Sequence, residues 1–200
     1  MAKAFKRKGR RFVARLDEVE REVVVGLMEQ THEFLAPAHR EPTGDTFDDL
    51  VATIETRQPD ESGAVAEQVP RDPALERMLP PAHRDDPAIA AEFRRLTEHG
   101  LRERKTANLA TAIAALLDGD KGKDGDQVRL DQEQAQAMVV ALTDVRLLLG
   151  ERLGLRTDDD VNALQDRLEA ASEDDPELHI AAYYDFMTWL QESLTQALMD

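Results

Sequence analysis

Apolar residues recur three and four positions apart through most of the chain, which is the spacing of one face of an α-helix. The pattern predicts four main helices, over residues 17–36, 101–117, 131–153 and 177–198. The expected inner stripe of the first helix consists of Val19, Val23, Leu27 and Phe34 or Leu35. Shorter helices are expected at residues 47–54, 72–79 and 161–168.

Two helical segments carry features that the simple stripe does not explain. After Asp86 as a cap and Pro87 as a first helical residue, one face is formed by Ile89, Phe93 and Leu96. Thr97 and Gly100 then predict a break or kink before Leu101. In the last helix, Trp189 lies well off the stripe, which is formed by Ile180, Tyr183, Tyr184, Met187, Leu190, Leu194 and Leu198. Either that helix packs on two sides, or Trp189 anchors a partner protein.

The first residues, AFKRKGRRFVARL, predict a short β-hairpin, because Gly9 can adopt the positive φ of a tight turn between two short arms. Two later strings, RLDEVE and RLDQEQ, share a strand-like lead-in followed by an aspartate that caps a helix. They indicate either similar capping chemistry alone or two strands of one small sheet. We expect the segment 128–130 to lie beside the hairpin, because an isolated hairpin is only marginally stable. The expected fold is mainly α: a helical bundle with a small N-terminal β-hairpin and a third short strand.

Composition then limits the range of functions. The chain of 200 residues suits a single domain over residues 1–200, with a flexible loop at 57–73 and another loop at 119–127. It contains no cysteine, which excludes disulfides, thiolate metal sites and a cysteine nucleophile. No signal-peptide pattern and no apolar run long enough to span a membrane is present, so we expect a cytoplasmic protein.

The charge is unevenly placed, with a formal net charge of −16 for the chain. The first fifteen residues hold no acid and contain the basic residues Lys3, Lys6, Arg7, Lys8, Arg10, Arg11 and Arg15. The rest of the chain is strongly acidic and repels polyanions at long range. From the residues alone, three uses of the basic hairpin stay open: it binds DNA or RNA, it docks on an acidic protein surface, or it has no specific role.

Other candidate sites are weaker. The basic residues at 94–105 alternate with glutamates, which favours ion pairs within a helix over a recognition helix. The loop after Asp120 has a poor calcium-ligand pattern, with Gly122 at the third position and Asp131 at the twelfth. The five histidines lack metal-ligand spacing, and no catalytic motif is present. We therefore expect no metal, no cofactor and no enzymatic activity.

Four strings together carry a family resemblance: FKRKGRRFVARLD (5–17), MLPPAHRDDPAIAAEFRRLTE (78–98), VRLDQEQAQAMVVALTDVRLLLGERLG (128–154) and AAYYDFMTWLQESL (181–194). With them the chain resembles an actinobacterial family of domains of unknown function whose members are described as oxidative stress transcriptional regulators of the AosR type. The resemblance covers nearly the whole chain and keeps the order of the segments.

The resemblance implies a DNA-associated regulator of redox and sulfur metabolism genes that works with an RNA polymerase sigma factor. It also implies switching by an intramolecular disulfide, which this cysteine-free chain cannot form. We therefore expect a non-enzymatic transcriptional regulator that contacts DNA through the hairpin, a sigma factor, or both. The alternative is a cytoplasmic protein-interaction module, an adaptor in stress signalling or proteolysis, that makes no contact with DNA.

Overall fold

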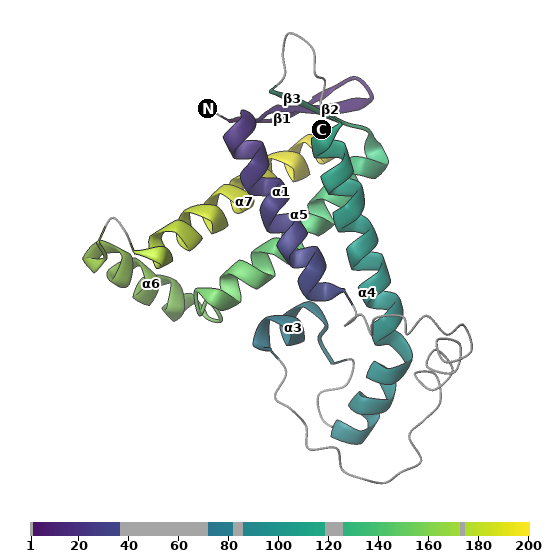
Figure 1. Cartoon of the computed structure of the whole chain (residues 1–200), viewed down its shortest axis with the longest axis vertical. Helices are drawn as coiled ribbons and strands as arrows, with labels where there is room; N and C mark the ends of the chain where they lie inside the picture. The colour runs from purple at the N-terminus through teal and green to yellow at the C-terminus, as the bar shows by residue number, and fades with distance from the viewer. Residues whose placement is uncertain (1, 37–71, 82–85, 119–125, 173–174) are drawn as a thin grey trace, which may run out of the picture. The chain divides into compact units, whose positions relative to one another are not determined.

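The computed structural model describes residues 2–36, 72–81, 86–118, 126–172 and 175–200. In chain order the elements are β1 (Lys3–Lys8), β2 (Arg11–Arg15), α1 (Glu18–Leu35), α3 (Pro73–Met78), α4 (Pro87–Leu117), β3 (Gln127–Leu130), α5 (Gln132–Arg152), α6 (Asp158–Ala170) and α7 (Pro176–Met199). The predicted fold class is confirmed: the chain is mainly helical, with a three-stranded antiparallel sheet that joins an N-terminal hairpin to a later strand (Figure 1).

The two helices that follow strands begin as their sequences predict. The Asp17 carboxylate accepts a hydrogen bond from the Glu20 amide at 3.0 Å, and the Glu20 carboxylate accepts one from the Asp17 amide at 2.8 Å. Asp131 and Gln134 repeat this reciprocal arrangement at the start of α5, with both distances 2.9 Å. Each capping box satisfies amides that the first helical turn leaves unpaired, so it fixes where strand ends and helix begins.

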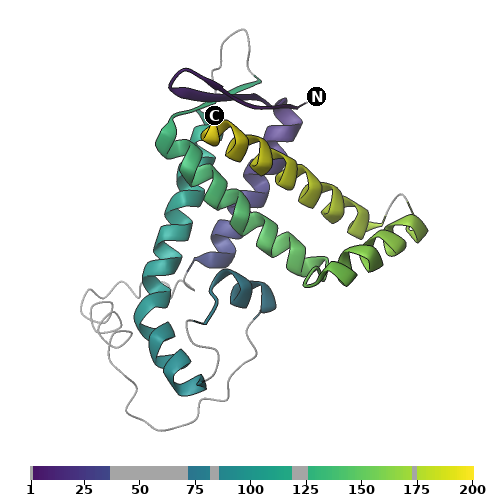
Figure 2. The ribbon, with the colours of Figure 1, turned by 180° about the vertical axis from the view of Figure 1, so that it is seen from behind.

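The core is built around α5, which contacts α1, α3, α4 and α7. Its residues Met138, Leu142 and Val145 are fully buried. The sheet lies across one end of these helices, as the two opposite views show (Figures 1 and 2). Phe12 of β2 and Leu130 of β3 point from the sheet into the same core.

Two expected apolar faces are wrong in detail. In α1 the buried residues are Val24, Val25, Met28, Thr31 and Leu35, whereas Val19 is 69% exposed. The true inner stripe is rotated by about one residue from the predicted one, because α1 packs against both α4 and α5. The predicted face at the start of α4 is also outside the core, with Ile89, Phe93 and Leu96 all exposed.

Of the break or kink predicted in α4, the break is wrong, and the kink stays a prediction. The helix is continuous from Pro87 to Leu117. Thr97 lies inside it with its hydroxyl donating to the carbonyl of Phe93 at 2.8 Å, and Gly100 lowers local helix propensity without ending the helix. The short helices expected near 72–79 and 161–168 are confirmed as α3 and α6.

Several expectations fall outside the described residues. These are the helix at 47–54, the loop at 57–73 up to residue 71, and the loop at 119–127 up to residue 125. Asp72 is the N-cap of α3, and Gln127 already belongs to β3. A single domain over residues 1–200 stays a prediction. Among the described helices, none combines the length and the apolar character that crossing a membrane requires.

Candidate nucleic-acid interface

The hairpin turns at Gly9, whose φ of +63° lies in the left-handed region. Lys8 pairs with Arg11, Arg7 with Phe12 and Lys6 with Val13, and an irregularity in β1 follows towards Lys3. Glycine suits this turn because other L-residues are strained at such a φ. The predicted hairpin is therefore confirmed, including the role of its glycine.

The central strand β2 also pairs with β3, as predicted for the segment 128–130. Val13 lies opposite Arg129, and Arg15 lies opposite Gln127. Residues paired across strands present their side chains on the same face of a sheet. Arg129 therefore joins the side of the sheet that carries Lys6, although more than a hundred residues separate the two in sequence.

The sheet has one apolar face and one basic face. Phe5, Phe12, Ala14, Val128 and Leu130 belong to the core. The register places the following side chains on the opposite side, which we call the basic face: Lys3, Lys6, Lys8, Arg11, Arg15 and Arg129. All are exposed except Arg15, which is half-buried, and the three strands contain no Asp or Glu.

Val13 shows how the basic face is organised. It lies in the middle of that face and is only 9% exposed, yet it is not part of the core cluster. Its pairing partners are Lys6 and Arg129. The aliphatic stems of such long side chains can cover an apolar neighbour while their charged ends stay in water. The basic face is thus an ordered layer of aliphatic side-chain stems, with the charged ends of the side chains at its surface.

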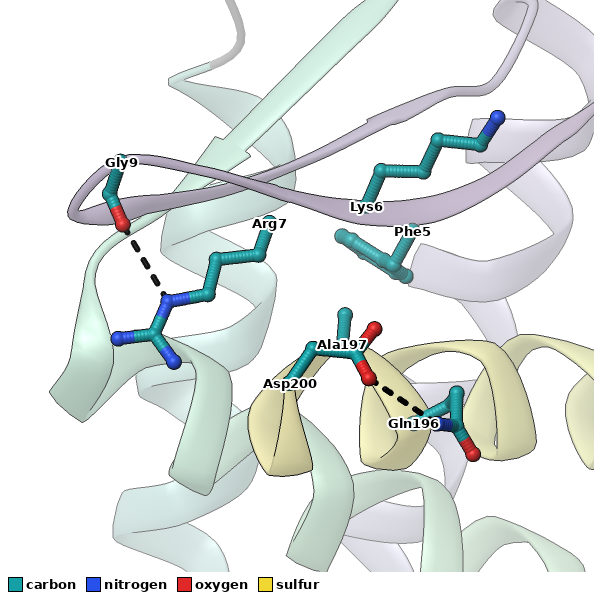
Figure 3. Close-up of a pocket in the computed structure, with 7 residues that line it drawn as sticks. All are labelled: Phe5, Lys6, Arg7, Gly9, Gln196, Ala197 and Asp200. Atoms are coloured by element: carbon teal, nitrogen blue, oxygen red, sulfur yellow. Dashed lines mark hydrogen bonds between the residues drawn. The ribbon is translucent and has the colours of Figure 1, made fainter.

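Arg7 and Arg10 occupy the tip and underside of the hairpin. Arg7 extends beneath the turn, where its Nε donates to the Gly9 carbonyl at 3.3 Å (Figure 3). It lines a hollow of about 670 Å³ between the hairpin and the last turn of α7. Arg7 also lines a second hollow of about 400 Å³, together with Arg10, Arg11 and residues at the start of α5. These arginines therefore extend the positive charge around the tip.

The sheet is fixed to the helices rather than attached only by its chain ends. The Ala2 amide donates to a Glu20 carboxylate oxygen at 2.6 Å, and the Phe5 amide donates to the Ser193 hydroxyl at 3.2 Å. The Leu16 amide donates to the Asp126 carbonyl at 2.8 Å. Because α1, α7 and the segment before β3 all hold it, the basic face is a platform of defined geometry.

Two arginines near the tip of the hairpin interact with other residues of the chain. Arg11 lies 3.6 Å from the Asp131 carboxylate, and the Arg7 guanidinium lies 6.0 Å from the centre of the Phe12 ring. Both arginines remain exposed. An ion pair that is open to solvent is weak, typically below about 1 kcal/mol, so a phosphate can compete for Arg11.

Basic residues in the segment 94–105 of α4 form ion pairs with glutamates of the same helix. Arg95 contacts Glu92 at 2.7 Å, and Arg102 contacts Glu98 at 2.9 Å. Arg102 also donates to the Leu35 carbonyl at the end of α1, at 2.8 Å. The predicted ion pairs within the helix are confirmed for Arg95 and Arg102, whereas Lys105 of the same segment pairs with Asp144 of α5.

No group of three or more histidine, aspartate or glutamate residues within the described ranges is placed to hold a metal ion. The sequence segment weighed as a calcium loop lies mostly outside those ranges. Within the described part of the chain, the basic face is therefore the strongest candidate for a binding site.

The comparison with known families covers almost the entire chain. A family model for a domain of unknown function, DUF2017, matches residues 2–198. This chain belongs to the DUF2017 family. No curated protein and no solved structure matches it. The DUF2017 match includes all three strands and hence the whole basic face.

Trp189, the other residue singled out from the DUF2017 sequence, lies on α7 away from the basic face. The residue is 36% exposed, and its indole stacks on Phe186, with 5.9 Å between ring centres and 16° between ring planes. It is therefore at the surface and not in a second core. The ring of Tyr184, on another side of α7, lies 3.4 Å from the position that a Cβ would take at Gly150 of α5.

One residue of the DUF2017 basic face was missed from the sequence, namely Arg129. The signal was present, because the repeated Arg-Leu-Asp string placed the segment 128–130 beside the hairpin. The register was needed to show that Arg129 and Lys6 lie on opposite sides of Val13.

Proposed function

We propose that this DUF2017 protein is a non-enzymatic transcriptional regulator that contacts DNA through the basic face of its sheet. One observation carries the proposal: six lysine and arginine side chains from three strands share one face that contains no acid. Two-stranded ribbons and sheets with such side chains bind DNA by placing them along the phosphate backbone.

The distribution of charge supports a single docking direction. The chain as a whole carries −16, so most of its surface repels a polyanion. A DNA duplex can approach closely only where the strands present positive charge. Arg10, an exposed residue of the turn, then adds positive charge at the tip, whereas Arg7 lies beneath the turn on the other side of the sheet.

The family resemblance points to the regulatory context. Similarity to oxidative stress regulators of the AosR type suggests action with an RNA polymerase sigma factor, and hence in the cytoplasm. Because this chain has no cysteine, its response to oxidants cannot arise from its own disulfide. In this proposal the signal comes from a partner protein, and the described chain supplies the DNA contact.

The test compares two variants that lose the same charge. Lys6→Gln/Lys8→Gln changes the basic face, and Arg95→Gln/Arg104→Gln changes exposed positions on α4. Each phosphate contact contributes about 0.9 to the slope of log K against log salt, which corresponds to about fivefold in affinity at 0.15 M salt. We expect the first variant to bind duplex DNA about 25-fold more weakly with a slope smaller by about 1.8. Equal losses in both variants, or no loss in the first, would contradict the proposal.

The second candidate is a protein-interaction module without DNA contact, an adaptor in stress signalling or proteolysis. The exposed indole of Trp189 and the acidic character of the chain favour it. A gel shift with promoter DNA and an affinity pull-down separate the two. Absence of DNA binding at low salt, together with one stoichiometric partner, would favour the module.

A further inference from the structure

An outward strip of α7 combines an aromatic anchor with unpaired carboxylates. Asp185, Trp189, Glu192 and Gln196 follow one another at spacings of four, three and four residues, which places them on one side of a helix. We call these four residues the α7 strip. All four are exposed, whereas Met187, Leu190, Leu194 and Ala197 on the other side of α7 are buried.

Trp189 is held in a fixed orientation at the centre of this strip. Phe186, one turn earlier, packs against the core and stacks under the indole at 5.9 Å between ring centres. An indole supported in this way offers a rigid apolar surface and loses little conformational freedom when a partner covers it. Tryptophan at such positions is enriched among the residues that dominate binding energy.

The charges beside the indole define the partner. Asp185 lies one turn before Trp189 and Glu192 lies one turn after it, and within the described part of the chain neither carboxylate has a hydrogen bond or ion pair. The sequence of α7 contains no Lys or Arg that could balance them. Such a surface repels nucleic acids and acidic membranes and attracts positive charge.

We propose that the α7 strip binds a basic amphipathic helix of a partner protein. Asp185 and Glu192 are seven residues apart, which is about 10.5 Å along a helix. The complementary segment has two Lys or Arg residues seven positions apart and a leucine between them. The leucine covers the indole while each cation pairs with one carboxylate, so spacing as well as charge is recognised.

The chain provides its own probe, because Trp189 is its single tryptophan. Three helical peptides of about 14 residues are titrated. The first has Lys at positions i and i+7 and Leu at i+4, the second has Glu in place of Lys, and the third keeps the Lys and Leu content in a scrambled order. We expect only the first peptide to shift the Trp189 emission to shorter wavelength in a saturable way, with calorimetry giving the same affinity.

Two charge-matched variants locate the contact. Asp185→Asn/Glu192→Gln should weaken the binding of the first peptide about tenfold, since each exposed ion pair contributes about threefold. Glu29→Gln/Glu33→Gln removes the same charge from exposed positions of α1 and should leave binding unchanged. Trp189→Ala should abolish binding measured by calorimetry, with the helical circular dichroism retained.

Several results would overturn this assignment. They are equal binding of the scrambled peptide, equal loss in the α1 variant, or no binding of the first peptide. Concentration-dependent dimerisation that the α7 variant removes would identify a second copy of the chain as the occupant instead. The assignment does not depend on DNA binding, because Lys6→Gln/Lys8→Gln replaces no residue of the α7 strip.

Discussion

Replacing Lys105 by methionine tests the buried ion pair between α4 and α5. The Lys105 ammonium lies 2.5 Å from Oδ1 of Asp144. The Asp144 side chain is fully buried, and 16% of the Lys105 side chain is exposed. Within the described structure, Oδ2 of Asp144 has no hydrogen-bond partner. The Asp144 carboxylate therefore depends on Lys105 to balance its buried negative charge.

The expected loss of stability follows from the difference in burial between Asp144 and Lys105. Lys105→Met keeps most of the side-chain volume but leaves a buried carboxylate without a cation, which costs about 3–5 kcal/mol of unfolding free energy. Asp144→Leu should cost less, because Lys105 can reach water from its partly exposed position. The double variant removes both charges and should lie within about 1–2 kcal/mol of the parent protein. The two substitutions are therefore expected to be strongly non-additive.

The pH dependence has a defined sign. Burial raises the pKa of the Asp144 carboxyl above its ordinary value and outweighs the opposing hydrogen bond from Lys105. Removing Lys105 raises this pKa further. Between the pKa of the unfolded state and the higher pKa of the folded state, the folded variant holds a proton that the unfolded chain releases, so the cost of Lys105→Met grows as the pH rises. It shrinks as the pH falls through the pKa of the folded state.

Urea unfolding followed by circular dichroism, at pH 7 and at pH 5, measures both quantities as differences from the parent protein. Arg104→Met, at an exposed neighbouring position on α4, is the control and should change stability by less than about 0.5 kcal/mol. A loss below about 1 kcal/mol for Lys105→Met at pH 7 would refute the reasoning. So would a loss that does not shrink on acidification.

Three further predictions concern the sheet and the opposite end of the helices. Arg129→Gln should lower DNA affinity about fivefold at 0.15 M salt and reduce the salt slope by about 0.9, whereas Arg104→Gln should change neither. Gly9→Ala should lower the melting temperature by roughly 2–4 °C, because alanine is strained at a φ of +63°. Glu151 accepts hydrogen bonds from Arg156 and Arg77, which lower its pKa below the ordinary value of 4.5. Glu151→Gln should therefore cost about 2 kcal/mol at pH 7 in urea unfolding, and the difference should vanish as acid protonates the folded parent protein.

Features encoded within a few residues could be predicted from the sequence. The capping boxes at Asp17 and Asp131 and the turn at Gly9 depend on side chains and backbone in the same short segment. The pairing of β3 with β2 was also accessible, because the isolated hairpin requires a further strand and the Arg-Leu-Asp string supplied a candidate.

Features that depend on contacts between distant elements were less accessible. The inner stripe of α1 is set by how that helix packs on α4 and α5, and several apolar residues, Val19 among them, were compatible with another rotation. α4 continues through Thr97 and Gly100 because the stability of the whole helix outweighs the low helix propensity of these two residues. The basic face required the register of β3, which brought Arg129 onto the side of Lys6.

The basic face and the α7 strip have opposite charge, and at the end of α7 one residue of each, Lys6 and Gln196, lines the same hollow. The Phe5 amide of β1 donates to the Ser193 hydroxyl, and Ser193 lies one helical turn beyond Trp189. If both proposed contacts form in one complex, their electrostatic coupling has a defined sign. A basic partner helix on α7 neutralises Asp185 and Glu192 and so removes part of the repulsion that DNA meets beside the sheet. DNA and partner should therefore strengthen each other's binding by the same factor, whereas a partner bound across the basic face would compete with DNA.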